Sequence, residues 1–430
     1  MDEHERQGWT VVAGGVLIFL MLGLTYTWSI FKDPLVEMFN WSQTEVQLAF
    51  SIMLAVFALT MIPAGMLQDK RGPKIVALAG GLLLCLGMVA TSLFANSPLM
   101  LYITYGVLVG AGVGLAYNTP IACSVKWFPQ RRGLVTGIVA FGFGFGSLII
   151  APVAQWLISR YGIMQSFMYL GVGLGAIIVL GALLLKNPPE SHPAAKKAAV
   201  ASEYGPIGML KTPQCWMLWV MFAFSAAAGL MVIGNLASFA KLSFTAGGMS
   251  ADAAKGLATL AVGVLAVFNG GGRILAGWVS DRIGREKTMF VMFGAQALLV
   301  ASVVFVSGFS PWALIGVMAL IGLCFGSNFS LFPSSTADYF GTKSVGVNYG
   351  FIFTSYGFGG IVGPMVMAYM LDAAKAATGT LAVGSYTLPF LLVGGLVGIA
   401  AVISLFTKCP GMKEEPAATA AAKPKAKKKK

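Results

Sequence analysis

Residues 65–72, Gly-Met-Leu-Gln-Asp-Lys-Arg-Gly, and residues 277–284, Gly-Trp-Val-Ser-Asp-Arg-Ile-Gly, decide the fold of this chain. Both have the pattern G-x-x-x-D-[K/R]-x-G, and both close a long apolar run. Trp127-Phe128 and Tyr339-Phe340 are separated by the same distance in sequence as the two motifs, and so are Pro152 and Pro364. Coincidences at one spacing predict that the chain contains two copies of one structural unit.

The composition indicates what each unit is made of. Hydrophobic residues make up 57% of the 430 residues, charged residues only 10%, and the mean hydropathy is +0.80. These values are typical of a lipid-embedded chain and exclude a soluble domain. At about 20 apolar residues per crossing, the chain accommodates roughly a dozen spans. Uncharged runs bounded by charge, Pro or Asn predict twelve helices, beginning near residues 9, 46, 74, 98, 132, 161, 214, 254, 288, 311, 344 and 384.

The polar stretches divide the chain. Residues 186–213 carry Pro188, Pro189 and several charged side chains, which is typical of a linker. We therefore predict a six-helix half over 1–185, a cytoplasmic linker over 186–213 and a second six-helix half over 214–407. The Ala- and Lys-rich tail, 408–430, cannot bury a core and is predicted to be disordered.

The formal net charge of +13 is explained by membrane orientation and not by nucleic-acid binding. Lys and Arg collect in alternate loops, in the linker and in the tail, and the loops of the opposite side hold only Lys32, Arg160, Lys241, Lys255 and Lys375. The positive-inside rule places both termini in the cytoplasm. The mixed-charge start, 2–6, precedes a run long enough to span, so we expect no cleaved signal.

The repeated motif has a mechanical logic. Its glycines let helices approach closely, and its aspartate can pair with cations or with a helix N-terminus across the cytoplasmic seam between the halves. The alternative is an ordinary charged turn. The motif resembles the signature loop of the major facilitator superfamily, which implies an all-α membrane fold of two pseudo-symmetric six-helix bundles. The predicted cytoplasmic gate consists of Gly65, Asp69, Lys70, Gly72, Gly277, Asp281, Arg282 and Gly284.

Arg273 is the one ionisable residue that must lie deep in an apolar run. Along its helix it lies about 27 Å from Lys255 and about 12 Å from Asp281. A cation at that depth costs at least ~2.5 to 3.5 kcal/mol, and the sequence provides no carboxylate inside an apolar run to offset it. We predict that the missing anion is the substrate. The alternative is that Arg273 reaches toward the cytoplasm or bonds to backbone carbonyls.

Other polar side chains at membrane depth are candidates for the same site. Asn269 precedes Arg273 by four residues and shares its helix face, while Tyr117 and Asn118 precede Pro120 in a Gly-rich helix. No cofactor is expected: the five cysteines are single, without metal or disulfide spacing. His4 and His192 are the only histidines, and no catalytic constellation indicates an enzyme. The remaining candidates for substrate binding are Tyr26, Tyr356 and Asn328.

Four local strings carry a closer resemblance. Together they look like the oxalate/formate antiporter family, which is related to the monocarboxylate transporters, and the resemblance implies that Arg273 binds a substrate carboxylate. It also implies a bacterial inner-membrane carrier, which we expect to be monomeric. The strings are Tyr26-Thr-Trp-Ser29, Val125-Lys-Trp-Phe-Pro129 with Arg131-Arg-Gly133, Leu331-Phe-Pro333 and Asn348-Tyr-Gly350.

One departure from that family bears on the substrate. Oxalate exchangers also carry a lysine in the eleventh helix, where this chain has Tyr356. With one cation instead of two, we predict transport of a small monocarboxylate such as lactate or pyruvate, with proton symport by alternating access, and oxalate:formate exchange is the alternative. Related monocarboxylate carriers place a carboxylate one turn before the arginine, where this chain has Asn269, so the residue that would carry a symported proton is not identified. Asp252, Asp281 and Asp338 are the nearest candidates.

Other classes explain the pattern less well. An anion channel would not require two halves with gate motifs, and a sugar or cationic-drug carrier of the same fold gains nothing from a buried guanidinium.

Overall fold

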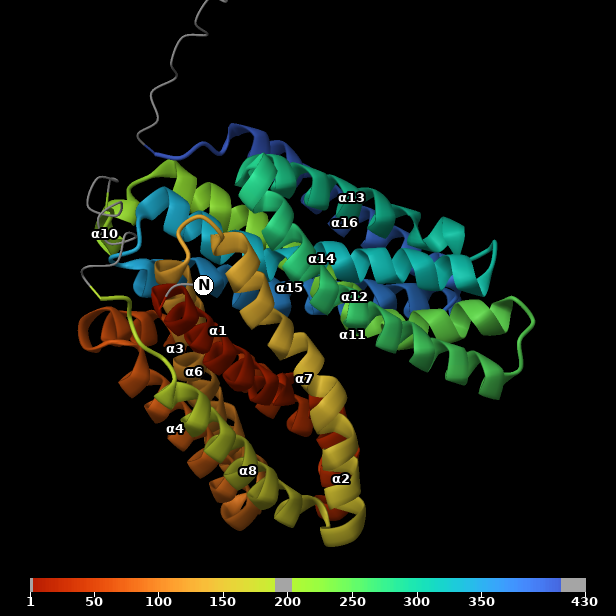
Figure 1. The fold of residues 1–430 in the computed structure, drawn as a ribbon. Helices are drawn as coiled ribbons and strands as arrows, with labels where there is room; N and C mark the ends of the chain where they lie inside the picture. The colour runs from red at the N-terminus through yellow and green to blue at the C-terminus, as the bar shows by residue number, and fades with distance from the viewer. Residues whose placement is uncertain (1–2, 190–202, 411–430) are drawn as a thin grey trace, which may run out of the picture.

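The computed structural model describes residues 3–189 and 203–410 and consists almost entirely of helices (Figure 1). Within these residues, twelve helical segments are long and apolar enough to cross a membrane. The all-α fold with twelve spans that the sequence predicted is confirmed. The middle of the predicted linker and nearly all of the predicted tail lie outside the described residues.

The first six spans form one bundle (Figure 1). A short 3₁₀ segment, η1, interrupts the first span, and a π-helical segment, η2, lies within the fourth. The elements are α1 (Glu3–Leu22), η1 (Gly23–Thr27), α2 (Trp28–Phe39), α3 (Gln43–Arg71), α4 (Pro73–Phe94), α5 (Pro98–Leu101), η2 (Tyr102–Val109), α6 (Gly110–Trp127), α7 (Arg132–Tyr161) and α8 (Ile163–Leu183).

The other six spans form the second bundle. It is preceded by a short helix in the predicted linker, α10 (Pro206–Leu210). Its elements are α11 (Pro213–Ala246), α12 (Ala251–Ile283), α13 (Arg285–Val306), α14 (Pro311–Phe340), α15 (Val345–Thr378), η3 (Val383–Tyr386) and α16 (Thr387–Phe406).

Local sequence explains where helices begin and end. The hydroxyl of Ser42 accepts the N–H of Glu45 and the Glu45 carboxylate accepts the N–H of Ser42, a capping box that starts α3. Gly72 ends α3 with φ +86°, and its repeat counterpart Gly284 ends α12 with φ +97°, a backbone region that favours glycine. The last glycine of each motif is therefore required by the turn.

The internal repeat is visible in matching contacts. Trp127 Nε1 donates to the carbonyl oxygen of Lys186, just after the last span of the first bundle, at 2.6 Å. Tyr339, its counterpart in the second copy, directs its hydroxyl to the carbonyl oxygen of Thr407, just after the last span of the second bundle, at 3.0 Å, and shares its proton with the carboxylate of Glu286. The same element of each bundle thus fastens the end of its sixth span.

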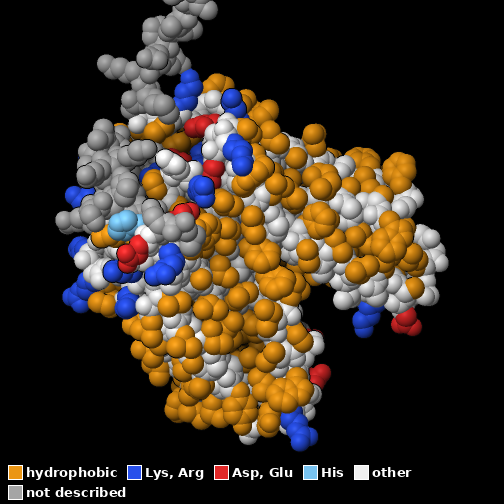
Figure 2. Space-filling view, viewed as in Figure 1, with side chains coloured by type: hydrophobic (Ala, Val, Ile, Leu, Met, Phe, Trp, Pro, Cys, Tyr) orange, Lys and Arg blue, Asp and Glu red, His pale blue; other side chains and the backbone are white. Residues whose placement is uncertain are grey.

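The two bundles meet chiefly along two helix pairs, α3 with α15 and α7 with α12, and less extensively where α14 packs against α7 and α15 against α6. Figure 1 shows the bundles close together at the end that carries the N-terminus and α10, which we call the linker side, and apart at the opposite end. Figure 2 shows a notch between them at that opposite end, hydrophobic side chains over much of the outer surface and charges gathered at the linker side. The structure is therefore closed on the linker side and open on the other.

Candidate functional site

Arg273 lies on α12 where that helix crosses α7, and its side chain is fully buried. Nε and Nη2 donate to Oδ1 of Asn269, one turn earlier, at 3.2 and 2.9 Å. Nη1 donates across the interface between the bundles to the carbonyl oxygen of Ala140 on α7, at 2.6 Å. The predicted pairing of Asn269 with Arg273 is present. The alternative prediction, that Arg273 bonds to backbone carbonyls, is met by one such bond, to Ala140.

Aromatic faces complete the surroundings of the guanidinium. Its central carbon lies 4.3 Å from the ring centroid of Phe329 and 5.9 Å from that of Phe143, so rings of both bundles present their negative faces to the cation. Within the described residues Arg273 has no carboxylate within ion-pair distance. Its charge is held by neutral groups only.

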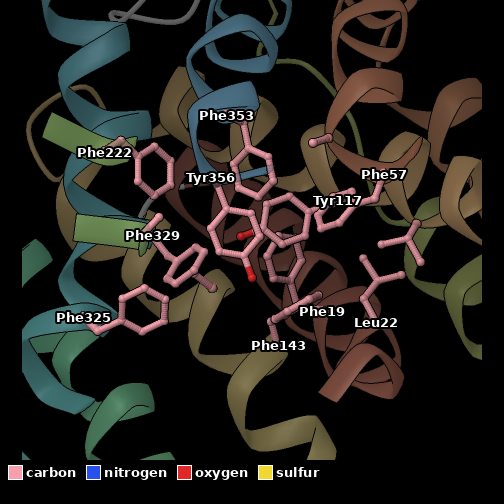
Figure 3. Close-up of a cluster of buried hydrophobic side chains, with 14 of the residues drawn as sticks. Phe19, Leu22, Phe57, Tyr117, Phe143, Phe222, Phe325, Phe329, Phe353 and Tyr356 are labelled. Atoms are coloured by element: carbon pink, nitrogen blue, oxygen red, sulfur yellow. The ribbon is translucent and has the colours of Figure 1, made fainter. Parts of the chain in front are cut away.

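Two predicted tyrosines, Tyr117 and Tyr356, lie in one aromatic cluster (Figure 3), and a third, Tyr26, contacts the cluster through Phe143. Tyr117 lies 5.2 Å from Phe143 and 5.1 Å from Phe353 between ring centroids, and the latter contact joins the two bundles. Tyr26, placed by η1, lies 5.0 Å from Phe143. Tyr356 lies 5.5 Å from Phe329 and interacts electrostatically with Tyr26, Tyr117 and Arg273. The fold thus brings Arg273, Asn269, Tyr26, Tyr117 and Tyr356 together.

Two buried hydroxyls near Arg273 lack a well-formed hydrogen bond. The side chains of Tyr117 and Tyr349 are fully buried, and each interacts electrostatically with the other and with Arg273. The two hydroxyls approach each other without reaching normal hydrogen-bond geometry, and within the described residues neither has another partner. A buried polar group whose hydrogen bonding is incomplete is costly, so these hydroxyls are well suited to a ligand oxygen.

Two predicted residues lie apart from this group. The amide of Asn118 donates to the carbonyl oxygens of Met61 and Gly346, at 3.0 and 2.7 Å. The amide of Asn328 donates to the hydroxyl of Ser225 at 2.8 Å, inside the second bundle. Their donors serve helix contacts, so we leave both residues out of the proposed binding group.

Glycines allow α7 to approach α12 at the depth of Arg273. A Cβ at Gly137 would collide with the carbonyl oxygen of Arg273, whereas one at Gly144 would stand 3.7 Å from Nη2. Three glycines, at 270, 271 and 272, directly precede Arg273 on α12. The structure shows packing at Gly270, against Phe141, and at Gly272, against the backbone of Leu323.

The two repeated aspartates cap helices of the opposite bundle. Asp69, near the end of α3, accepts the N–H groups of Gly346 and Val347 at 3.4 and 3.1 Å, in the first turn of α15. Asp281, near the end of α12, accepts the N–H groups of Gly133 and Leu134 at 2.9 and 2.8 Å, in the first turn of α7. A carboxylate at a helix N-terminus neutralises orphan donors and the helix dipole.

The charges around the two caps differ. Lys126 lies 3.5 Å from Asp69. At the other cap, Arg285 Nη1 lies 2.8 Å from Asp281 and Nε 2.7 Å from Asp338, whose second oxygen lies 2.6 Å from Arg132 Nη1 of the first bundle. The seam between α7 and α12 thus carries the denser charge network.

The remaining motif residues have plain roles. Gly65 lies against the backbone of Gly346, where a side chain would collide, and Gly277 lies against Gly133 in the same way. The side chain of Lys70 is exposed. Arg282 is also exposed and stacks on Trp278, with 3.5 Å from its central carbon to the ring centroid.

Sequence reasoning missed several of these contacts. Phe143 and Phe329 carry no polar atom, so nothing in their local sequence distinguishes them from core phenylalanines. Arg132 and Asp338 were visible as loop charges, but their pairing depends on how the bundles meet.

Known proteins resemble this chain in sequence and in fold. Residues 13–364 match the family model described as Major Facilitator Superfamily. The chain is 33% identical over 365 residues to the oxalate:formate antiporter of Oxalobacter formigenes, covering 83% of this chain and 84% of that protein. It is 24% identical over 406 residues to monocarboxylate transporter 13 of Bos taurus, covering 93% and 89%. The crystal structure of the transporter FucP in the outward conformation matches with a TM-score of 0.66 and 19% identity, over 91% of this chain and 98% of that chain.

Proposed function

Because this chain belongs to the Major Facilitator Superfamily, we propose that it is a secondary active transporter that moves a small monocarboxylate by alternating access, with Arg273 binding the carboxylate. The family and the fold predicted from the sequence are confirmed, and with them the class of multi-pass membrane transporter. The substrate, its coupling and its binding residues are the proposal.

The observation that supports the proposal is a buried guanidinium whose partners are all neutral. Arg273 has five N–H donors, and three hydrogen bonds, to Asn269 twice and to Ala140, use three of them. The remaining donors, together with the hydroxyls of Tyr117 and Tyr349, are suited to a planar carboxylate, which arginine binds through two parallel hydrogen bonds. A bound anion would also neutralise a charge that is costly at this depth.

Location supports the same assignment. Arg273 donates to Ala140 of the other bundle, so its side chain lies where the two bundles must move relative to each other. A ligand held there contacts both bundles and can favour one of their arrangements, which transport requires.

The neighbourhood of Tyr356 favours a monoanion over a dianion. Tyr356 is almost fully buried among Phe222, Phe329 and Phe353. The second cation that the family resemblance predicts for oxalate exchangers is absent from this position, so a second carboxylate would meet a neutral tyrosine hydroxyl and aromatic rings in place of a counter-charge. We therefore propose a lactate- or pyruvate-like substrate.

A second candidate is exchange of one carboxylate for another. The similarity to an oxalate:formate antiporter supports it directly. So does Asn269, because a neutral amide occupies the position where a proton-coupled carrier would place a carboxylate. Proton symport and anion exchange differ in what drives uptake, which makes them separable by experiment.

For orientation, we propose that the linker side faces the cytoplasm of a bacterial inner membrane and that the protein works as a monomer. The cations gather on that side, as the positive-inside rule requires (Figure 2). Both helix pairs that join the bundles come from one chain, so alternating access needs no second copy.

The decisive experiment measures uptake of labelled L-lactate into proteoliposomes, with and without an inward proton gradient. Arg273→Ala is expected to lower uptake by about tenfold to a hundredfold, since hydrogen bonds to a charged group contribute roughly 1.5 to 3 kcal/mol. Arg160→Ala removes an exposed arginine at the far end of α7 and serves as the matched control.

Stimulation by the gradient would indicate symport, whereas stimulation by preloaded lactate or formate without a gradient would indicate exchange. Full lactate uptake by Arg273→Ala would contradict the assignment of the carboxylate to Arg273. Uptake of oxalate or formate in place of lactate would favour the second candidate.

A further inference from the structure

Besides the aspartate caps, buried polar side chains also hydrogen-bond one bundle to the other. Asn118, on α6, is fully buried and donates one amide proton to Met61 of α3 and the other to Gly346 of α15. Both neighbours are carbonyl oxygens, so only the NH₂ end of the amide can face them. One side chain of the first bundle is thus hydrogen-bonded to the backbone of the second.

The internal repeat places a corresponding contact on the other seam. At the spacing of the two motifs, Ser330 is the counterpart of Asn118, and Leu134, close to Thr136, is the counterpart of Gly346. The hydroxyl of Thr136 on α7 approaches the carbonyl oxygen of Ser330 on α14 at 3.2 Å. Matching regions of the two halves therefore meet at both seams, with the donor on α6 at one seam and, two residues beyond the matching position, on α7 at the other.

We propose that Asn118 and Thr136 are positioning residues for the transport cycle, which hold the linker side closed through hydrogen bonds to the backbone of the other bundle. This rests on the proposed function only in assuming that the two bundles separate on this side during transport. It needs no particular substrate.

The two contacts differ in strength. The Asn118–Gly346 bond measures 2.7 Å and uses a proton of its own. The single proton of Thr136 is shared among three carbonyl oxygens, with those of Arg132 and Gly133 closer, at 2.8 and 2.9 Å, than that of Ser330. Asn118 is therefore expected to contribute more to closure.

Breaking the Asn118 contact leaves neither of its partners without hydrogen bonds. Asn118 keeps its bond to Met61 within its own bundle, and Gly346, inside α15, keeps the helical environment of its carbonyl. Buried hydrogen bonds in membrane proteins change an equilibrium by about threefold on average and near twentyfold at most. Loss of the Asn118 contact should therefore raise the ratio of linker-side-open to closed molecules by about threefold or more.

The test measures distances between spin labels at residues 74 and 287, exposed positions on the linker side of the two bundles. The label sites are introduced as cysteines in protein whose partly exposed Cys85 and Cys409 are replaced by serine. Double electron–electron resonance is recorded in lipid nanodiscs without substrate. Asn118→Leu should increase the long-distance population about threefold, and Thr136→Val should increase it less.

Two controls separate positioning from general loosening. Gln296→Leu removes an equally buried amide that bonds only to Ser225 within the second bundle, so it should leave the distances unchanged. Thr136→Ser keeps the hydroxyl and should restore the wild-type distribution.

An unchanged distribution in Asn118→Leu, or a change no larger than in Gln296→Leu, overturns the proposal. Should Asn118→Leu fail to assemble, the comparison of Thr136→Val with Thr136→Ser decides in the same way. Because no substrate is present, failure of lactate uptake leaves this result unaffected.

Discussion

At the scale of residues, the buried charge of Arg273 is the central feature. A guanidinium taken out of water ordinarily requires a carboxylate partner, yet this one is held by an amide, a backbone carbonyl and two aromatic faces. These groups orient the side chain without cancelling its charge. Such an arrangement is stable enough to form and still favours an incoming anion.

Tyr356 offers a way to change the charge class of the substrate. Tyr356→Lys would place a second cation beside Arg273, and a dianion would gain a charge-assisted hydrogen bond of roughly 1.5 to 3 kcal/mol. We expect the ratio of oxalate to lactate uptake in proteoliposomes to rise at least about tenfold. Tyr356→Phe, which removes only the hydroxyl, is the control and should keep the wild-type preference. An unchanged ratio in the lysine variant would show that Tyr356 does not contact the second carboxylate.

At this scale the sequence predicted part of the site. Arg273 stood out because a lone cation inside an apolar run has few physical explanations, and helical spacing placed Asn269 beside it. Asn118 looked equally promising, but its amide bonds to backbone carbonyls of α3 and α15. Whether a buried amide faces a ligand or bonds to a neighbouring helix depends on how the helices cross. The amino-acid sequence of one helix does not reveal that crossing.

At the scale of elements, an aspartate of each bundle caps the N-terminus of a helix in the other bundle. Asp69 caps α15 and Asp281 caps α7, so the first turns of two helices depend on the opposite bundle for their hydrogen-bond partners. Separation of the bundles on this side exposes those N–H groups. The caps therefore couple helix stability to the closed arrangement.

The two caps are predicted to be unequal. The distances at Asp281 are shorter, and Arg285 and Asp338 extend its network to Arg132 of the first bundle. A carboxylate at a helix N-terminus contributes up to about 2 kcal/mol in partly buried geometry. We expect Asp281→Asn to raise the linker-side-open population by about tenfold and Asp69→Asn by about threefold, measured with the same label pair.

The control for this comparison is Asp372→Asn, which neutralises an exposed carboxylate on α15. Equal shifts in the two cap variants would contradict the asymmetry.

Hydropathy and motif spacing predicted most elements. All twelve spans were predicted, because the backbone N–H and C=O groups of a long uncharged run can form their hydrogen bonds within a bilayer only if the run is helical. The break at η1 escaped prediction, since Gly23–Thr27 contains no proline or charge. That break places Tyr26 against Phe143. The position of Tyr26 in the site therefore depends on a backbone conformation that the sequence did not predict.

At the scale of the whole molecule, orientation can be tested directly. Residues 247 and 343 are exposed and lie in turns on opposite sides of the bundles, between α11 and α12 and between α14 and α15, so each can be replaced singly by cysteine. A membrane-impermeant maleimide added to intact cells should label the cysteine at 247 and leave the cysteine at 343 unlabelled until the membrane is broken. The reverse pattern would contradict the proposed cytoplasmic linker side.

The repeat predicted the molecular architecture, because one spacing shared by several pairs of residues requires matching positions in two bundles. It could not predict which side is closed. That depends on the sum of the caps, the glycine contacts and the network of Arg285, all of which form only where the folded bundles touch.

The closed linker side has a consequence for measurements made from the two faces of the membrane. A ligand that approaches the open side reaches Arg273 once the side chains that bury it move aside, whereas one that approaches the linker side must wait for the fraction of molecules in which the bundles have separated there. Its apparent dissociation constant rises by the inverse of that fraction. The same site would therefore show two half-saturation concentrations, lower outside than inside, although every contact with the ligand is identical.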